Sequence, residues 1–63
     1  MLVHWLDSRD AEMWEVRITK EGEISFTSDD GRHTFTTANP SGQLASKLTD
    51  VELEQLLDRA REK

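Results

Sequence analysis

The sequence predicts an α+β fold, a four-stranded antiparallel β-meander with one C-terminal α-helix packed on one face of the sheet. Apolar and polar residues alternate through 13–28, as they do in strands that bury one face. Short turns containing glycine separate the alternating segments. Toward the C-terminus the apolar spacing changes to three and four residues, which is typical of a helix. We expect one domain over 1–63, with strands near 1–6, 13–19, 23–28 and 32–38, a connector over 39–48 and a helical segment over 49–62.

The central hairpin sets the register of the predicted sheet. Alternation assigns five apolar side chains to its core face: Trp14, Val16, Ile18, Ile24 and Phe26. The loop between its strands is Lys20-Glu21-Gly22, with glycine last. Because glycine adopts the left-handed conformation without a Cβ clash, this loop predicts a type I turn followed by a bulge.

The outer hairpins extend this register on both sides. In the first hairpin, Asp7 opposite Glu12 gives three core-facing pairs: Trp5 with Trp14, Val3 with Val16 and Met1 with Ile18. In the third, Asp30-Gly31 predicts a type I′ two-residue turn that pairs Asp29 with Arg32. The same turn sets two further pairs: Phe26 with Phe35 and Ser28 with His33. Turn chemistry and alternation therefore predict one consistent sheet.

The segment after the sheet carries the stop and start signals of a C-terminal helix. Asn39-Pro40 ends the fourth strand, and we expect the following connector to be anchored by Leu44. Thr49 and Glu52 have the spacing of a capping box, so the helix is expected over 50–62. Its apolar stripe faces the sheet and consists of Leu53, Leu56, Leu57 and Ala60.

The composition argues against several classes of function. The 63 residues include no cysteine, so neither a disulfide framework nor a thiolate zinc site is expected. The net charge of −5 opposes binding to a phosphate backbone. No apolar run reaches the roughly 18 residues that span a bilayer, and no leader segment is recognisable. We expect a cytoplasmic protein without a membrane partner.

The two histidines are the best candidates for chemistry, and their positions argue against a shared site. The register places His4 on the outer face, opposite Glu15, and His33 on the core face, so both cannot ligate one ion. We expect His33 to pack beside Trp14 at the sheet edge. The sequence shows no activated nucleophile and no phosphate-binding loop. It predicts neither an enzyme nor a cofactor or metal site.

The first strand is unusual because it is apolar on both faces. Leu2 and Leu6 are predicted on the outer face with His4 between them, and Met13 lies opposite Leu6. Isolated surface leucines are ordinary in monomers, and this remains the alternative interpretation. Val51, on the helix face away from the leucine stripe, is a further exposed apolar residue. We interpret Leu2, His4, Leu6 and Met13 as a candidate protein contact.

The function predicted by these features is that of a small protein-binding or regulatory accessory module. Its partner would be another protein or a second copy, held through the edge of the first strand. An acidic inhibitor or nucleic-acid mimic that acts on a basic enzyme is the alternative. Nucleic-acid binding is disfavoured, because the outer face offers neither aromatic stacking platforms nor clustered bases. Metal binding is disfavoured for the reasons given above.

Overall fold

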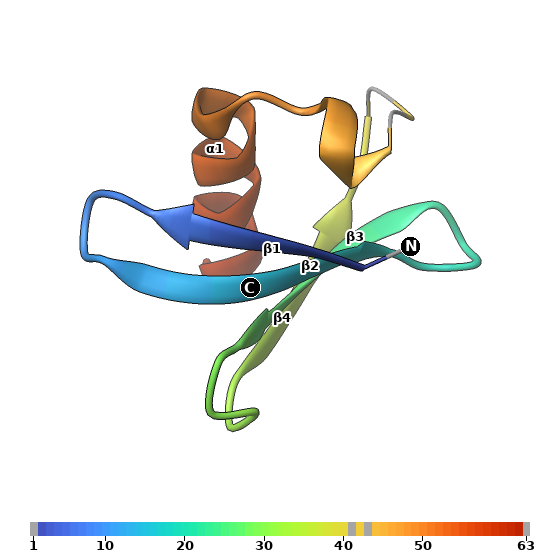
Figure 1. Cartoon of the computed structure of the whole chain (residues 1–63). Helices are drawn as coiled ribbons and strands as arrows, with labels where there is room; N and C mark the ends of the chain where they lie inside the picture. The colour runs from blue at the N-terminus through green and yellow to red at the C-terminus, as the bar shows by residue number, and fades with distance from the viewer. Residues whose placement is uncertain (1, 41, 43, 63) are drawn as a thin grey trace.

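The computed structural model describes residues 2–40, 42 and 44–62 and shows the predicted architecture (Figure 1). Four antiparallel strands form one sheet in the order β1-β2-β3-β4, so the meander is confirmed. A short 3-10 helix and one α-helix follow the sheet. The elements are β1 (Leu2–Asp7), β2 (Glu12–Ile18), β3 (Glu23–Ser28), β4 (Thr34–Ala38), η1 (Ala45–Lys47) and α1 (Asp50–Arg61).

The predicted register is confirmed in all three hairpins. Trp5 faces Trp14 and Val3 faces Val16 between β1 and β2, and Phe26 faces Phe35 between β3 and β4. The predicted pair of Met1 with Ile18 lies outside the described residues. A register error of one residue would move every apolar side chain to the other face, so the agreement fixes which face is the core.

The turn of the central hairpin has the predicted form. The amide of Gly22 donates to the carbonyl of Thr19 at 3.1 Å, and the amide of Thr19 donates to Glu23 at 2.8 Å. Gly22 has φ +81°, in the left-handed region that a type I turn with a bulge requires of its last loop residue. Glycine is therefore the residue that this turn needs.

The turn of the third hairpin differs from the predicted type I′ turn. The amide of Gly31 donates to the carbonyl of Ser28 at 2.9 Å, so Asp29 and Asp30 occupy the centre of the turn. Gly31 has a positive φ and Asp30 does not, whereas a type I′ turn needs positive φ at both central positions. The Asp29–Arg32 pair is therefore wrong, and β4 begins at Thr34 rather than near residue 32.

Side-chain hydrogen bonds explain this difference. The carboxylate of Asp30 accepts from the Ser28 hydroxyl at 2.6 Å and from the Arg32 amide at 3.0 Å. The Ser28 hydroxyl in turn accepts from the amide of His33 at 3.1 Å. These local bonds compete with a tight two-residue turn. The predicted pairing of Ser28 with His33 is kept, since the Ser28 amide donates to the His33 carbonyl at 2.8 Å.

The connector before the helix is anchored by residues other than Leu44. The side chain of Leu44 is 56% exposed, whereas Ala45 and Leu48 are buried in the core. A 3-10 turn brings residues three apart to the same side, which turns Ala45 and Leu48 toward the sheet and leaves Leu44 outside. The prediction that Leu44 anchors this segment is therefore wrong.

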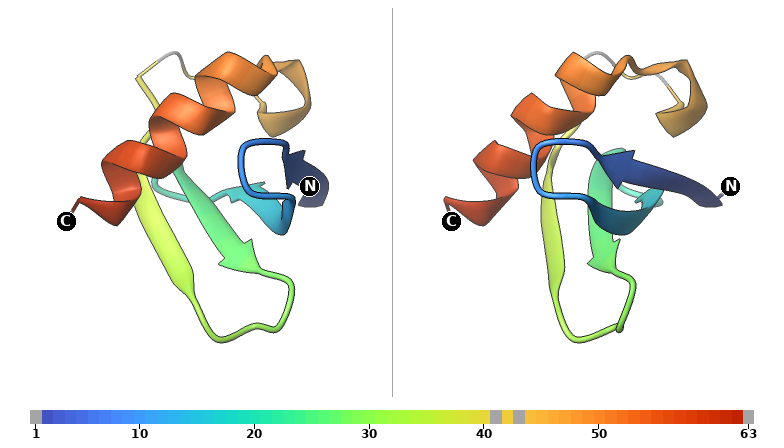
Figure 2. Two further views of the ribbon diagram at one scale, coloured as in Figure 1. Left: turned by 90° about the vertical axis from the view of Figure 1, so that its left-hand side faces the viewer. Right: turned by 60° about the vertical axis from the view of Figure 1, so that its left-hand side comes forward.

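The helix begins at the predicted capping box and buries the predicted stripe. The Glu52 amide donates to the Thr49 hydroxyl at 3.3 Å, and the Thr49 amide donates to the Glu52 carboxylate at 3.0 Å. Both η1 and α1 lie on the same side of the sheet (Figure 2). Between the two layers the core consists of Trp5, Trp14, Val16, Ile24, Phe26, Ala45, Leu48, Leu53, Leu56 and Leu57.

Candidate functional site

The outer face of β1 carries the residues that the sequence singled out as a protein contact. Leu2, His4 and Leu6 alternate with the buried Trp5 and therefore project away from α1. We call Leu2, His4, Leu6 and Met13 the outer strip.

Two of its members meet across the hairpin. Met13 is the cross-strand partner of Leu6, while Leu2 lies farther along β1, opposite Arg17. The exposed fractions are 44% for Leu2, 52% for Leu6 and 38% for Met13, and His4 is also exposed. The outer strip is therefore an exposed group of mainly apolar side chains, with Leu2, His4 and Leu6 on β1 and Met13 on β2.

The backbone of β1 adds unpaired hydrogen-bonding groups to this row. The amide of Thr19 donates to the carbonyl of Glu23, so alternation makes the amides and carbonyls of Glu15 and Arg17 point at β3. The residues between and beside them, Trp14 and Val16, then bond to β1.

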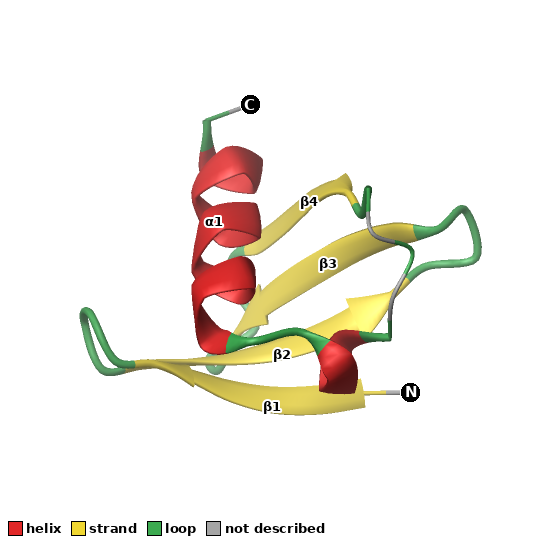
Figure 3. Ribbon diagram, turned by 90° about the horizontal axis from the view of Figure 1, so that it is seen from above, coloured by secondary structure: helices red, strands yellow, loops and turns green. Residues whose placement is uncertain are grey.

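On β1 itself, their partners Val3 and Trp5 consequently point their amides and carbonyls at β2. Those of Leu2, His4 and Leu6 point away from the sheet. No described segment lies beyond β1 on that side (Figure 3). Both leucines of the outer strip, Leu2 and Leu6, therefore belong to the free backbone edge, with His4 between them.

The turn that follows β1 holds this edge in place. Asp7, the last residue of β1, is buried, and its carboxylate accepts hydrogen bonds from the Arg9 guanidinium at 2.9 and 3.0 Å. These bonds hold the pKa of Asp7 below its ordinary value, against the opposing effect of burial. Arg9 also donates to Asp58 of α1 at 2.9 Å. The sequence pattern gave no sign of this cluster, because it depends on Asp58, which is remote in sequence.

A second contact ties the end of α1 to β2. The guanidinium carbon of Arg61 lies 5.2 Å from the ring centroid of Trp14 and 6.0 Å from that of Phe35. The same guanidinium lies 3.8 Å from the carboxylate of Glu12.

The two histidines are far from forming a common site. His33 is exposed, and its ring stacks on Phe35 with centroids 6.2 Å apart. The expected packing of His33 beside Trp14 is not among the ring contacts: the Trp14 ring contacts Phe35 and the Arg61 guanidinium. Within the described part of the chain no three histidine or carboxylate side chains gather closely enough to hold a metal ion.

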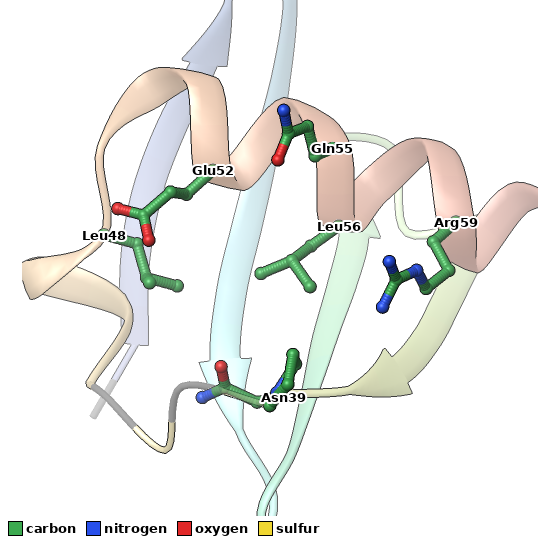
Figure 4. A pocket seen from close by; sticks show the side chains of 7 residues that line it. Asn39, Leu48, Glu52, Gln55, Leu56 and Arg59 are labelled. Atoms are coloured by element: carbon green, nitrogen blue, oxygen red, sulfur yellow. The ribbon is translucent and has the colours of Figure 1, made fainter.

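A small pocket lies between α1 and the segment after β4 (Figure 4). Its volume is about 130 Å³, well below the roughly 300 Å³ at which small-molecule sites begin. Its lining combines aliphatic, amide and charged side chains: Asn39, Pro40, Leu48, Glu52, Gln55, Leu56 and Arg59. This pocket gives no support for an enzyme active site.

The chain matches no protein-family model, and comparison with curated proteins and with solved structures gives no match. Among residues 2–40, 42 and 44–62, no helix has the length and apolar character needed to cross a bilayer.

Proposed function

We propose that this protein is a non-enzymatic protein-binding module that acts as an accessory or regulatory subunit. Its contact site is the outer strip together with the free backbone edge of β1. The observation that carries the proposal is the coincidence of both features on Leu2, His4 and Leu6, whose side chains are exposed and whose amides and carbonyls have no strand partner.

An edge of this kind is normally protected in a protein that works alone. Natural sheets place charges, proline or a covering segment at their edges to prevent association. Residues 2–6 include no Asp, Glu, Lys, Arg or Pro, and the carboxylate of Asp7 at the end of β1 is hydrogen-bonded to Arg9. The absence of protection supports a strand that is meant to pair, by addition of a further strand to the sheet.

The opposite edge of the sheet offers a weaker case. Its edge-facing residues are Thr34, Thr36 and Ala38, because Phe35 and Thr37 pair with β3. The side chains of Thr34 and Thr36 are polar, and α1 packs on this strand. A partner at β4 would therefore gain less apolar burial than a partner at β1.

The test is capture of partners by the wild type and by two matched double variants. Leu2→Lys/Leu6→Lys places charges on the outer strip, and Thr34→Lys/Thr36→Lys places the same charges on β4. We expect the first variant to lose about tenfold or more in affinity for a captured partner or a second copy, and the second to bind as the wild type does. Equal binding by all three proteins would contradict the proposal.

A further inference from the structure

We infer that the partner of the β1 edge is a second copy of this chain, paired antiparallel to the first about a two-fold axis that passes beside His4. This inference rests on the proposed function, since it uses the same edge. It adds the identity of the partner and the register of the contact. The result would be one continuous eight-stranded sheet with both helical layers on the same side.

The register follows from the groups that β1 leaves unpaired. Only Leu2, His4 and Leu6 point their amides and carbonyls outward, so only these three can form hydrogen-bonded pairs across the axis. Placing His4 opposite its own copy sets Leu2 opposite Leu6 of the second copy, and Leu6 opposite Leu2. All outward groups are then used, whereas a shift of two residues leaves one residue of each strand unpaired.

The side chains are self-complementary in the same register. On the outer face Leu6, already beside Met13, gains Leu2 of the second copy as its new neighbour. The two-fold axis repeats this row, so two apolar rows flank the central pair of His4 side chains. A second copy therefore covers the most exposed apolar groups of the strip, which a polar partner strand would not do.

The net charge opposes pairing of two copies, but the contact itself contains no carboxylate. Each copy carries a net charge of −5, so two copies repel one another at low ionic strength. Residues 2–6 contain no carboxylate, and that of Asp7, at the end of β1, is hydrogen-bonded to Arg9. We expect added salt to strengthen this association by screening the repulsion. Added salt would instead weaken binding to a basic protein, because it would screen an attraction.

The size of the contact sets its strength. A stable dimer buries about 800 Å² per partner, about a fifth of the 4264 Å² that this chain exposes. One strand of six residues covers less than that. The dimer is therefore weak, and the dimeric fraction rises with protein concentration.

Single cysteines test the register directly, because the natural chain has none. At a hydrogen-bonded pair the Cα atoms are about 5.5 Å apart, within the range that a disulfide spans. His4→Cys lies opposite its own copy, so an added oxidant should link most of this variant into dimers. Leu2→Cys lies about 14 Å along the strand from its copy, so it should stay monomeric.

Three further samples complete the experiment. Leu6→Cys alone should resemble Leu2→Cys, and a mixture of the two should give a mixed disulfide. Thr36→Cys, the central edge-facing residue of β4, serves as the matched control and should not be linked. Circular dichroism of each reduced variant shows that its sheet and helix are intact.

The outcomes separate this inference from the proposed function. The inference is supported if His4→Cys is linked as a single sample and if Leu2→Cys and Leu6→Cys are linked only when they are mixed. Equal linkage of all cysteines, or linkage of Thr36→Cys in place of His4→Cys, overturns the register. If none is linked while a different protein still binds the wild type and not Leu2→Lys/Leu6→Lys, self-pairing is wrong and the proposed function stands. If that binding is absent as well, both are wrong.

Discussion

The side chains of Asp7 and Arg9 form an ion pair at the turn between β1 and β2. The Nε atom of Arg9 lies 3.0 Å from one carboxylate oxygen of Asp7, and its Nη2 atom lies 2.9 Å from the other. Arg9 reaches on to Asp58 at 2.9 Å, so the pair joins the end of β1 to α1. Because Asp7 is buried and Arg9 is not, Asp7 is the member of the pair whose loss should matter most.

Substitution of Asp7 by asparagine should destabilise the fold. The variant loses charge-assisted hydrogen bonds to Arg9 but leaves that guanidinium partly hydrated, so we expect about 1–3 kcal/mol less free energy of unfolding. Urea denaturation measures the change. Asp58→Asn removes an exposed carboxylate from the same arginine and should cost no more than about 1 kcal/mol. Equal losses in the two variants would contradict a special role for Asp7.

Stability should fall on the acid side. Hydrogen bonds from Arg9 hold the pKa of Asp7 below its ordinary value of 3.8. A lowered native pKa gives stability that is complete above the unfolded value and is lost as the pH falls through the native value.

The difference between wild type and Asp7→Asn in urea should therefore be constant near neutral pH and shrink below about pH 4. The Ser28 hydroxyl similarly lowers the pKa of Asp30, so Asp30→Asn is measured in parallel. An Asp7 difference that stays constant down to about pH 2 would refute this coupling.

Arg61 should stabilise the contact of α1 with β2. Its guanidinium lies 5.2 Å from the Trp14 ring centroid, a distance typical of a cation–π interaction. We expect Arg61→Gln to lower the free energy of unfolding by about 0.5–2 kcal/mol and to shift the tryptophan fluorescence. Arg59→Gln, on the pocket side of the same helix, is the matched control and should leave the fluorescence unchanged.

Ala11 is strained, and glycine should relieve the strain. It has φ +58°, and it is the one non-glycine residue with positive φ in the described part of the chain. The left-handed conformation costs a non-glycine residue about 1–2 kcal/mol. Glycine avoids this cost, but it loses more conformational freedom on folding, which offsets part of the gain in stability. We expect Ala11→Gly to raise the midpoint of urea unfolding, while Ala11→Val should lower it. A lower midpoint for Ala11→Gly would show that the loop needs the alanine side chain.

The sheet could be predicted because its register depends on counting residues. Alternation fixes which side chains share a face, and each turn length fixes which residues face one another. Trp5 opposite Trp14 follows from that arithmetic. Phe26 stays opposite Phe35 although the third turn is longer than predicted, because the turn gains one residue on each side. The outer strip follows in the same way, since its face and its edge position need only a period of two.

Features that depend on contacts between distant segments could not be predicted. The burial of Asp7 needs Arg9 to fold back, and Arg9 is held by Asp58, which is remote in sequence. Arg61 over Trp14 depends likewise on how α1 crosses the sheet. The errors at Leu44 and at Asp30 were local, because a 3-10 turn and a side-chain hydrogen bond replaced the simpler geometry that the sequence favoured.

The measurement that tests the central claim most directly is sedimentation over a wide range of concentrations. Wild type, Leu2→Lys/Leu6→Lys and Thr34→Lys/Thr36→Lys are compared at low and at high salt. The account predicts that the wild type and the β4 variant shift toward dimer as concentration and salt increase, while the β1 variant stays monomeric. Identical monomeric behaviour of all three proteins, or loss of the dimer only in the β4 variant, would contradict association through the β1 edge.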